Sequence, residues 1–303
     1  MEFTALKYFH EAVRSGSIRR AAETLHITAS SVSRAIAALE HELGTPLFER
    51  TRKGVRLTAA GTLLERHTLR TLRDLERVQD SIDDLRGLHR GTVTLYAAEG
   101  LVAEFLPSII SQFNQKHPKI SFEIRFGSTD EIVGAVIDDH ADIGIMFNGP
   151  HRSDLASIVE HADALCCLLS PNHPLVSRAQ DGIVKLEDVL DWPLALPEKS
   201  FGMRRMIDDA VAERSGVARL ILNTNSLELA KRTAISGDAV AFMPGFMVRE
   251  EVEAGRLYAF RIDSTKLDAA RVTVCVHQGR EPSFAARALL DLLRRRFADL
   301  KQG

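Results

Sequence analysis

Apolar residues recur at helical spacing in three short segments near the start of the chain, at residues 6–13, 17–25 and 28–43. Good N-cap residues, Ser17 and Thr28, open the second and third segments, and glycines follow the first and third. The apolar faces consist of Leu6, Phe9 and Val13, then Ala21, Ala22 and Leu25, then Val32, Ile36, Leu39 and Leu43. The pattern therefore predicts three closely spaced helices.

The polar face of the third segment carries short side chains around one arginine. Ser30, Ser33, Arg34 and Ala37 project away from the apolar stripe at about 100° per residue. A solvated helix usually carries long Lys and Glu side chains there, whereas a helix in the DNA major groove needs small residues and a few hydrogen-bonding groups. The pattern favours a recognition helix. The alternative is a small helical subdomain whose serine-rich face is merely exposed.

A basic turn follows this helix. Residues 49–58 have the pattern of two short strands around Arg52 and Lys53, which is typical of a wing that meets phosphates. We therefore predict a winged helix-turn-helix DNA-binding domain over residues 1–58, with Arg34 at a base and the wing at the DNA backbone or minor groove. The predicted DNA-binding residues are Thr28, Ala29, Ser30, Ser31, Ser33, Arg34, Arg52 and Lys53.

A long helix is predicted next, over about residues 58–88. Residues at alternating spacings of four and three share one stripe, with charged residues between them, as in a coiled coil. The stripe consists of Thr71, Leu75, Val78, Ile82 and Leu85. We expect residues 59–89 to form a linker helix that dimerises the chain. The alternative is that this stripe seals the helix onto its own domain.

Residues 9–61 resemble the N-terminal domain of LysR-type transcriptional regulators. The matching marks are Gly16-Ser17, Ala21-Ala22, Leu25, Ser33-Arg34, Ile36, Leu39-Glu40, Leu43-Gly44, Leu47-Phe48, Arg50, Leu57-Thr58 and Gly61. The family commonly opens its recognition helix with Gln-Pro or Gln-Ser, whereas this chain has Ala29-Ser30, so the amide contact to adenine is absent at position 29. The resemblance implies double-stranded promoter DNA as a partner, a homodimer through the linker helix, a homotetramer through effector-domain contacts, and RNA polymerase as a further partner.

Strand and helix patterns alternate over residues 90–303, which predicts an α/β effector-binding domain of two lobes. The first set has strands at 92–98, 121–126 and 141–147 and helices at 101–116 and from 130; the second has strands at 194–196, 219–223 and 239–242 and helices at 203–214 and 227–235. Residues 163–169 and 272–276 are expected to cross between the lobes, ahead of a helix at 283–300. Lobe I is then about 91–163 and 272–303, and lobe II about 164–271. This arrangement resembles the periplasmic-binding-protein-like effector domain of the same family.

Ligands in open α/β sheets bind beyond the carboxyl ends of strands, near helix N-termini. By the resemblance, these positions face the cleft between the lobes, and a small-molecule co-inducer is expected there with no cofactor. The candidate effector-binding residues are Glu99, Gly100, Ser128, Thr129, Phe147, Ser200, Phe201 and Phe246. Ser128 and Thr129 are equally suited to helix capping. Glu99 would repel an acidic effector, or prefer an amine or a hydroxyl.

Composition excludes several classes of protein. The 303 residues are 45% hydrophobic and 26% charged, as in ordinary globular proteins of two or more domains. No run approaches the ~18 apolar residues of a membrane span, and the first residues lack the pattern of a signal peptide. Residues 1–90 carry 15 Lys and Arg against 12 Asp and Glu, and residues 91–303 carry 24 against 29, so a net +3 and a net −5 give the total of −2. An excess of three is weak by itself, so the positions of the basic residues carry the DNA-binding argument.

Cysteines and catalytic motifs give no sign of an enzyme. Cys166, Cys167 and Cys275 form no CxxC pair and no metal-ligand spacing with a histidine, which fits a reducing cytoplasm. Buried structural thiols are favoured over a redox switch at Cys166 and Cys167. The chain has no GxSxG, no phosphate-binding glycine loop and no HExxH. We expect a regulator. Alternatives are a solute-binding module or enzyme with a fused helical arm, and a sugar-operon repressor, which would need a much larger effector portion.

Overall fold

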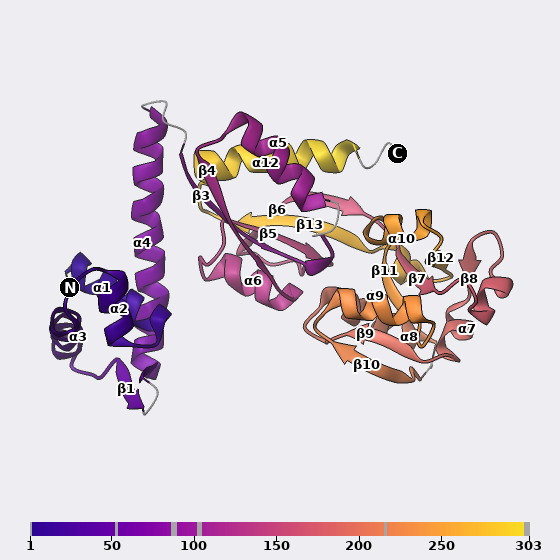
Figure 1. Cartoon of the computed structure of the whole chain (residues 1–303), viewed down its shortest axis with the longest axis horizontal. Helices are drawn as coiled ribbons and strands as arrows, with labels where there is room; N and C mark the ends of the chain where they lie inside the picture. The colour runs from indigo at the N-terminus through magenta and orange to yellow at the C-terminus, as the bar shows by residue number, and fades with distance from the viewer. Residues whose placement is uncertain (1, 52–53, 86–89, 102–104, 215–216, 300–303) are drawn as a thin grey trace. The chain divides into compact units, whose positions relative to one another are not determined.

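The computed structural model describes residues 2–51, 54–85, 90–101, 105–214 and 217–299, and the chain divides into two compact units, Met1–Ile82 and Asp83–Gly303 (Figure 1). The first unit contains α1 (Phe3–Ser15), α2 (Ile18–Thr24), α3 (Ala29–Leu43), the antiparallel strands β1 (Phe48–Thr51) and β2 (Gly54–Leu57), and most of α4 (Ala59–Leu85). The order of three helices, a hairpin and a long helix is the one predicted.

Local capping sets the ends of the first helices. The Ser17 side chain accepts a hydrogen bond from Arg20 N at the start of α2, and Gly16 and Gly44 end α1 and α3 with φ of 63° and 67°, in the left-handed region that glycine tolerates. The helices pack around two small cores, which contain Phe9, Leu39 and Leu47 in one, and Ala12, Ala21, Ala22, Val32 and Ile36 in the other. Small alanines at these contacts allow the helices to approach closely.

The hairpin is fixed to the helices at both of its sides. Glu40 Oε1, on α3, accepts a hydrogen bond from Leu47 N at 2.8 Å, and Val55 N donates to Gly16 O at 3.1 Å. At Gly61 a Cβ atom would lie 2.1 Å from Leu47 O, so α4 approaches the chain before β1 too closely for any side chain there. These contacts give a physical reason for several of the family marks in the sequence.

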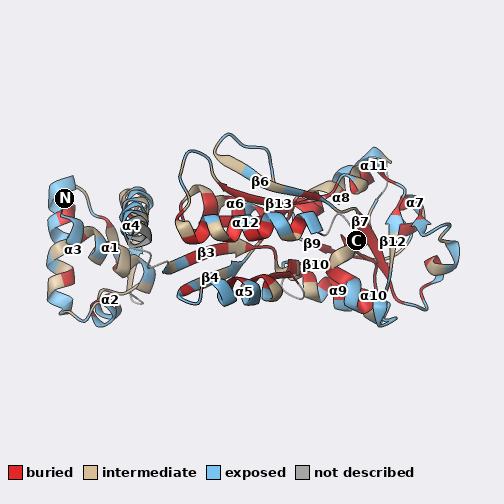
Figure 2. Ribbon diagram, turned by 90° about the horizontal axis from the view of Figure 1, so that it is seen from above, coloured by how far each residue is buried: buried red, intermediate tan, exposed pale blue. Residues whose placement is uncertain are grey.

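Lobe I of the second unit is a five-stranded sheet with helices on both faces. The strand order is β4-β3-β5-β13-β6, in which β3 is parallel to β4 and β5, and β13 is antiparallel to β5 and β6. The strands are β3 (Gly91–Ala97), β4 (Ile120–Phe126), β5 (Ile143–Phe147), β6 (Leu155–Ala162) and β13 (Arg271–His277), and the helices are α5 (Phe105–Lys116), α6 (Thr129–Ile137) and α12 (Phe284–Asp299). Helices α5 and α12 cover one face and α6 the other (Figure 1). The central strands are buried along most of their length (Figure 2).

Lobe II contains a four-stranded sheet, β11-β7-β12-β8, and the parallel pair β10-β9, and a parallel bridge between Leu194 and Val240 joins the two. The strands are β7 (Leu165–Leu169), β8 (Ile183–Val184), β9 (Leu194–Pro197), β10 (Leu220–Thr224), β11 (Ala241–Pro244) and β12 (Tyr258–Ile262). The helices are α7 (Leu186–Leu190), α8 (Gly202–Glu213), α9 (Leu227–Ser236), α10 (Arg249–Glu253) and α11 (Thr265–Asp268), and the 3₁₀ turns of the unit are η1 (Glu99–Leu101), η2 (Pro174–Arg178) and η3 (Gly245–Val248).

The chain passes between the lobes twice, between β6 and β7 and between α11 and β13. The two crossings are hydrogen-bonded to each other, since Asp163 N donates to Ala270 O at 3.0 Å. Several elements went unpredicted, namely β6, β8, β12, α7, α10 and α11. The edge strand β6 is mostly half-buried and lacks the strict alternation that signals a strand. The strand expected at 239–242 begins at Ala241, and the helix expected from Leu101 is η1 there, followed by α5 from Phe105.

Candidate functional site

The start of α3 is organised by Thr28. Its side chain accepts a hydrogen bond from Ser31 N at 3.2 Å, and its hydroxyl lies 2.9 Å from the hydroxyls of both Ser30 and Ser31. Thr28, Ala29 and Ser30 are exposed, and Ser31 is half-buried. This end of the helix therefore presents three hydroxyls and a methyl group without a bulky side chain, as a helix needs for close approach to base edges.

Arg34 lies one turn further along α3 with its side chain exposed, and Ser33 beside it is half-buried. No hydrogen bond or ion pair engages Arg34 within the described residues, whereas Arg14 and Arg19 pair with Glu11 and Glu23. Its guanidinium is therefore available to an external acceptor. Arg52 and Lys53 lie outside the described residues.

The stripe on α4 is open to solvent in the single chain. Leu75, Val78 and Ile82 are 47%, 56% and 40% exposed, and Thr71 is exposed too. The side chain of Leu85 lies outside the described part of the chain. Three large apolar residues spaced by three and four on one helix make a face that is typical of an interface.

Thr129 is buried where lobe I touches lobe II. Its hydroxyl donates to Phe147 O at 3.1 Å and accepts from Gly202 N at 2.8 Å, across the lobe boundary. A Cβ atom on Gly202 would lie 2.3 Å from Phe147 O, so only glycine allows this approach of α8 to β5. Asp130 N also donates to Ser200 O at 3.2 Å. The structure thus brings three of the candidate residues together, Thr129, Phe147 and Ser200, but as a direct contact between the lobes.

The cap of α6 is Ser128, not Thr129. The Ser128 side chain accepts from Glu131 N, and the Glu131 carboxylate accepts from Ser128 N at 2.8 Å, which is a complete capping box. Phe201 is buried at the start of α8, and the rings of Phe147 and Phe246 lie 6.3 Å apart between their centroids. These side chains are part of the packing between the lobes.

A cavity of about 390 Å³ lies at another part of the lobe boundary. The described residues that line it are Glu99, Gly100, Phe126, Leu227, Glu228, Lys231, Met243 and Met247. Glu99 and Gly100 are therefore the two candidate residues that line it, while Phe246 lines a separate pocket with Arg249. The Glu99 carboxylate, from lobe I, accepts hydrogen bonds from Leu227 N at 2.7 Å and from the Ser226 hydroxyl at 3.3 Å, at the N-terminus of α9 in lobe II.

Lys231, which the sequence did not single out, is a buried cation in this cavity wall. Its Nζ lies 2.9 Å from Glu228 and 2.8 Å from Glu251, and its side chain is 9% exposed. Burial opposes its charge, but hydrogen bonds to Glu251 and Glu228 outweigh burial and raise the pKa of Lys231. The signal available in the sequence was the spacing of Glu228 and Lys231 by three residues on one helix.

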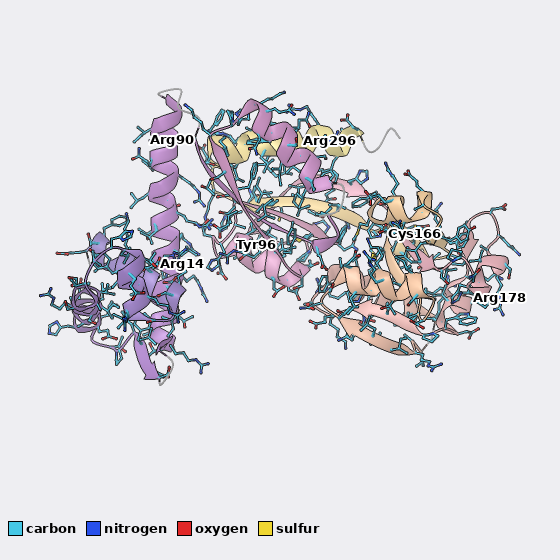
Figure 3. The ribbon with its side chains drawn as sticks, viewed as in Figure 1. Arg14, Arg90, Tyr96, Cys166, Arg178 and Arg296 are labelled. Carbon is cyan, nitrogen blue, oxygen red and sulfur yellow. The ribbon has the colours of Figure 1, made fainter. Side chains whose placement is uncertain are left out.

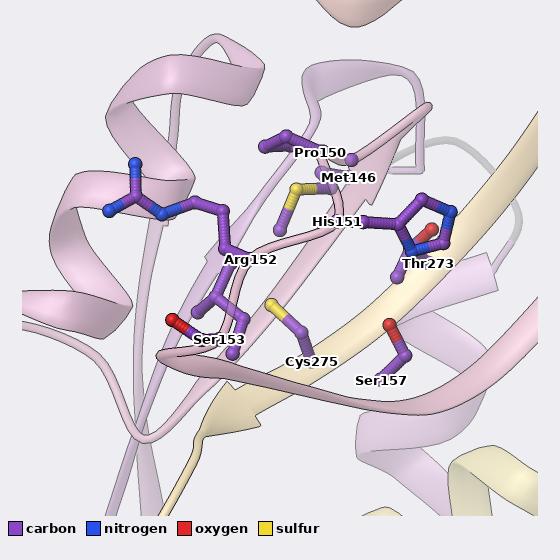
Figure 4. A pocket seen from close by; sticks show the side chains of 10 residues that line it. Met146, Pro150, His151, Arg152, Ser153, Ser157, Thr273 and Cys275 are labelled. Carbon is purple, nitrogen blue, oxygen red and sulfur yellow. The ribbon is translucent and has the colours of Figure 1, made fainter.

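A further pocket, of about 310 Å³, lies within lobe I between β5, β6, β13 and the loop that follows β5 (Figure 4). Figure 4 shows Ser157, Thr273 and Cys275 on the strand side and Pro150 and His151 on the loop. None of the candidate effector residues is among its described lining. Most of its polar side chains come from one exposed loop.

All three cysteines are free and buried. Burial, and then the nearby Asp163, raise the pKa of Cys166 to about 11, and burial alone raises that of Cys275 to about 12. Burial also raises the pKa of Cys167, its neighbour on β7. Cys166 lies inside lobe II (Figure 3). Reactive cysteines have a lowered pKa, so burial and the raised pKa values favour structural thiols.

The described residues provide neither a metal-binding cluster nor a membrane-spanning helix. No group of three or more His, Cys, Asp or Glu side chains among them is placed to hold a metal ion. Within the same ranges, no helix is long and apolar enough to cross a membrane.

Family models match both parts of the chain. Residues 3–62 match the bacterial regulatory helix-turn-helix protein, lysR family, and residues 86–298 match the LysR substrate binding domain. Among curated relatives, the transcriptional dual regulator GltC of Bacillus subtilis (strain 168) is 30% identical over 246 residues, which is 80% of this chain and 81% of GltC. A probable RuBisCO transcriptional regulator of Gracilaria tenuistipitata var. liui is 26% identical over 286 residues, 93% of this chain and 92% of that protein.

Solved structures of two regulators are similar in fold. Full-length CbnR complexed with its target DNA has a TM-score of 0.66 at 21% identity, over 97% of this chain and 99% of that one. The effector binding domain of QuiR in complex with shikimate has a TM-score of 0.60 at 18% identity, over 69% of this chain and 98% of that one. At these identities the likeness shows the shared fold, a helix-turn-helix unit joined to an α/β domain of two lobes.

Proposed function

The chain belongs to the LysR family of transcriptional regulators, and from this we propose that its α3 helix reads promoter DNA while a small molecule between its lobes modulates the promoter. The observation that carries the proposal is the exposed face of α3, where small residues surround an arginine that pairs with nothing in the described chain. A free guanidinium on such a face can donate two hydrogen bonds to guanine.

Each candidate residue has a proposed role at the DNA. Arg34 contacts a guanine in the major groove, and Ser30 and Ser33 contact base edges or phosphates near it. Thr28, Ala29 and Ser31 shape the start of α3, where the free N–H groups attract a phosphate. Arg52 and Lys53, in the wing turn, are assigned to the DNA backbone or the minor groove. The likeness to CbnR, which was solved with its target DNA, supports this placement of the helix-turn-helix.

A binding assay separates base reading from charge. Arg34→Ala should weaken binding to a selected DNA site by about 1–3 kcal/mol and relax the sequence preference at one base pair. Lys53→Ala should weaken binding to all DNA sequences alike and lower the slope of log binding constant against log salt concentration by about one. Arg125→Ala, an exposed arginine on β4, is the control and should change neither. If Arg34→Ala loses affinity uniformly across a sequence library, Arg34 does not read a base.

We also propose that α4 forms the dimer seam. The exposed Leu75, Val78 and Ile82 would be covered by the same residues of a second copy, because a two-fold interface is self-complementary. A dimer places two α3 helices on half-sites about one DNA turn apart, so the operator should be partly palindromic. A tetramer through the effector domains, and RNA polymerase at the promoter, complete the proposed partners of this regulator in the cytoplasm.

The effector is proposed to bind in the cavity beside Glu99. This cavity takes residues from both lobes, so a ligand in it favours one arrangement of the lobes, by roughly 1–3 kcal/mol for a typical allosteric coupling. Thr129, Phe147, Ser200 and Phe246 form a contact at another part of the lobe boundary and act on closure, and Ser128 and Phe201 flank them in the sequence. The structure of the QuiR domain with shikimate supports a small effector in a domain of this fold.

A further inference from the structure

The cavity beside Glu99 has a carboxylate already placed at the position that an anionic ligand would take. The N-terminus of α9 carries partial positive charge and attracts anions. Glu99 fills this position from the opposite lobe, with its Oε2 2.7 Å from Leu227 N. A second anion there would compete for the same N–H group and meet the like charge of Glu99.

Lys231, the one cation among the described residues that line the cavity, does not reverse this preference. The Lys231 ammonium contacts both Glu228 and Glu251, so two carboxylates compensate its charge. Glu228 in turn pairs with Arg232 at 2.7 Å. Glu99 differs from these residues, because no cationic side chain pairs with it in the part of the chain that the structure describes.

The other described residues that line the cavity suit the apolar part of a ligand. Leu227, Met243 and Met247 line the cavity with apolar and flexible side chains, and methionine adapts to ligands of irregular shape. Phe126, at the end of β4, is 48% exposed and lines the same cavity. An aromatic face attracts a cation, and this attraction adds to that of Glu99.

We propose that the cavity binds a small amphiphilic ammonium, with its cation at Glu99 and Phe126 and its apolar part against the methionines. This proposal rests on the cleft being the effector site and names the chemical class of the effector. Glu99 repels carboxylates of the same size, and neutral analogues bind more weakly because they lack the attraction between an ammonium and the Glu99 carboxylate.

Three probes with one phenylethyl body test the class: phenethylamine, phenylpropanoate and phenethyl alcohol. Their binding to the full chain is measured by calorimetry at neutral pH. The amine should bind at least about tenfold more tightly than the alcohol, with no measurable binding of the carboxylate. Equal binding of the three, tighter binding of the carboxylate, or no binding of the amine overturns the proposal.

Two variants locate the preference at Glu99. Glu99→Gln keeps an oxygen for Leu227 N but removes the charge, so the amine should lose about tenfold while the alcohol is unchanged. Glu123→Gln is the matched control, since it removes an exposed carboxylate of β4 that does not line the cavity. An unchanged preference for the amine in Glu99→Gln shows that Glu99 does not select the ligand and overturns the proposal.

The same preparations are tested for binding to a pool of random DNA duplexes. Selection of a palindromic site together with no preference for the amine rejects the ligand class and leaves the regulatory function standing. A clear amine preference without any DNA selected supports the ligand class, and it counts against the proposed function instead.

Discussion

Substitution of Thr129 by valine tests whether the contact between the lobes is a controlling element. Valine has nearly the shape of threonine but no hydroxyl, so it removes the acceptor for Gly202 N, which lies 2.8 Å from Thr129 Oγ1. It also removes the donor to Phe147 O, which stays within lobe I. Thr129→Val should therefore favour separation of the lobes while leaving each lobe folded.

The size of the effect follows from burial. Thr129 is 3% exposed, so in the closed arrangement the Gly202 N–H of the variant would have no partner and no access to water. An unsatisfied buried donor costs about 1–3 kcal/mol, whereas in the separated arrangement water can replace the hydroxyl. The ratio of closed to open molecules should fall by about 5–150-fold.

Single-molecule energy transfer between the lobes measures that ratio directly. Dyes attached through Lys116→Cys, on α5 of lobe I, and Lys185→Cys, before α7 of lobe II, sit at exposed positions. The native cysteines are all buried and should not take the label. Thr129→Ser keeps the hydroxyl and is the matched control.

We expect a low-transfer population to grow in Thr129→Val but not in Thr129→Ser, with little change in the melting temperature of either lobe. If the two variants have the same distribution of transfer efficiencies as the parent, the hydrogen bond to Gly202 does not hold the lobes together.

The exposed stripe of α4, the buried Cys166 and the half-buried Asp163 can each be tested by substitution or labelling. Replacement of both Leu75 and Ile82 by lysine should give monomers in sedimentation, because the α4 stripe would place like charges against the same stripe of a second copy. A dimer that stays intact would show that α4 is not the dimer interface. Cys166, with a pKa of about 11, should resist a thiol reagent at pH 8 until the chain is unfolded, and rapid labelling of the folded chain would contradict its burial. Burial raises the pKa of Asp163, so its contribution to the stability of the fold is present at low pH and is lost as the pH rises through the folded-state pKa. Asp163→Asn should flatten this pH dependence of the free energy of unfolding in urea. An unchanged pH dependence in the variant would contradict the raised pKa of Asp163.

Local signals in the sequence predicted the DNA-binding unit well. Ser17, Thr28 and Gly44 mark helix ends through contacts within a few residues, so their effect can be inferred without knowing the path of the chain. The helix cap at Ser128 was predictable for the same reason. The roles of Arg34 and the wing at DNA remain predictions.

The contacts between the lobes could not be predicted in this way. Thr129 pairs with Gly202, and Glu99 with Leu227, across more than seventy residues of sequence. Which strand ends face each other depends on how two sheets pack, and residue types alone do not encode it. Lys231 shows the same limit, because a lysine on an amphipathic helix is usually solvated, and here tertiary packing buries it against Glu251.

The hydrogen bond from Leu227 N to Glu99 also makes one backbone amide a natural probe of whether the two lobes are together or apart. The first N–H groups of a helix have no partner inside that helix, and α9 takes one of its partners from the other lobe. Exchange of the Leu227 amide with deuterium should therefore be slow only while the lobes stay together. The resonance of the Leu227 amide would then report opening events that are too rare to change the average structure. It would do so both in the protein without attached dyes and in the protein bound to DNA.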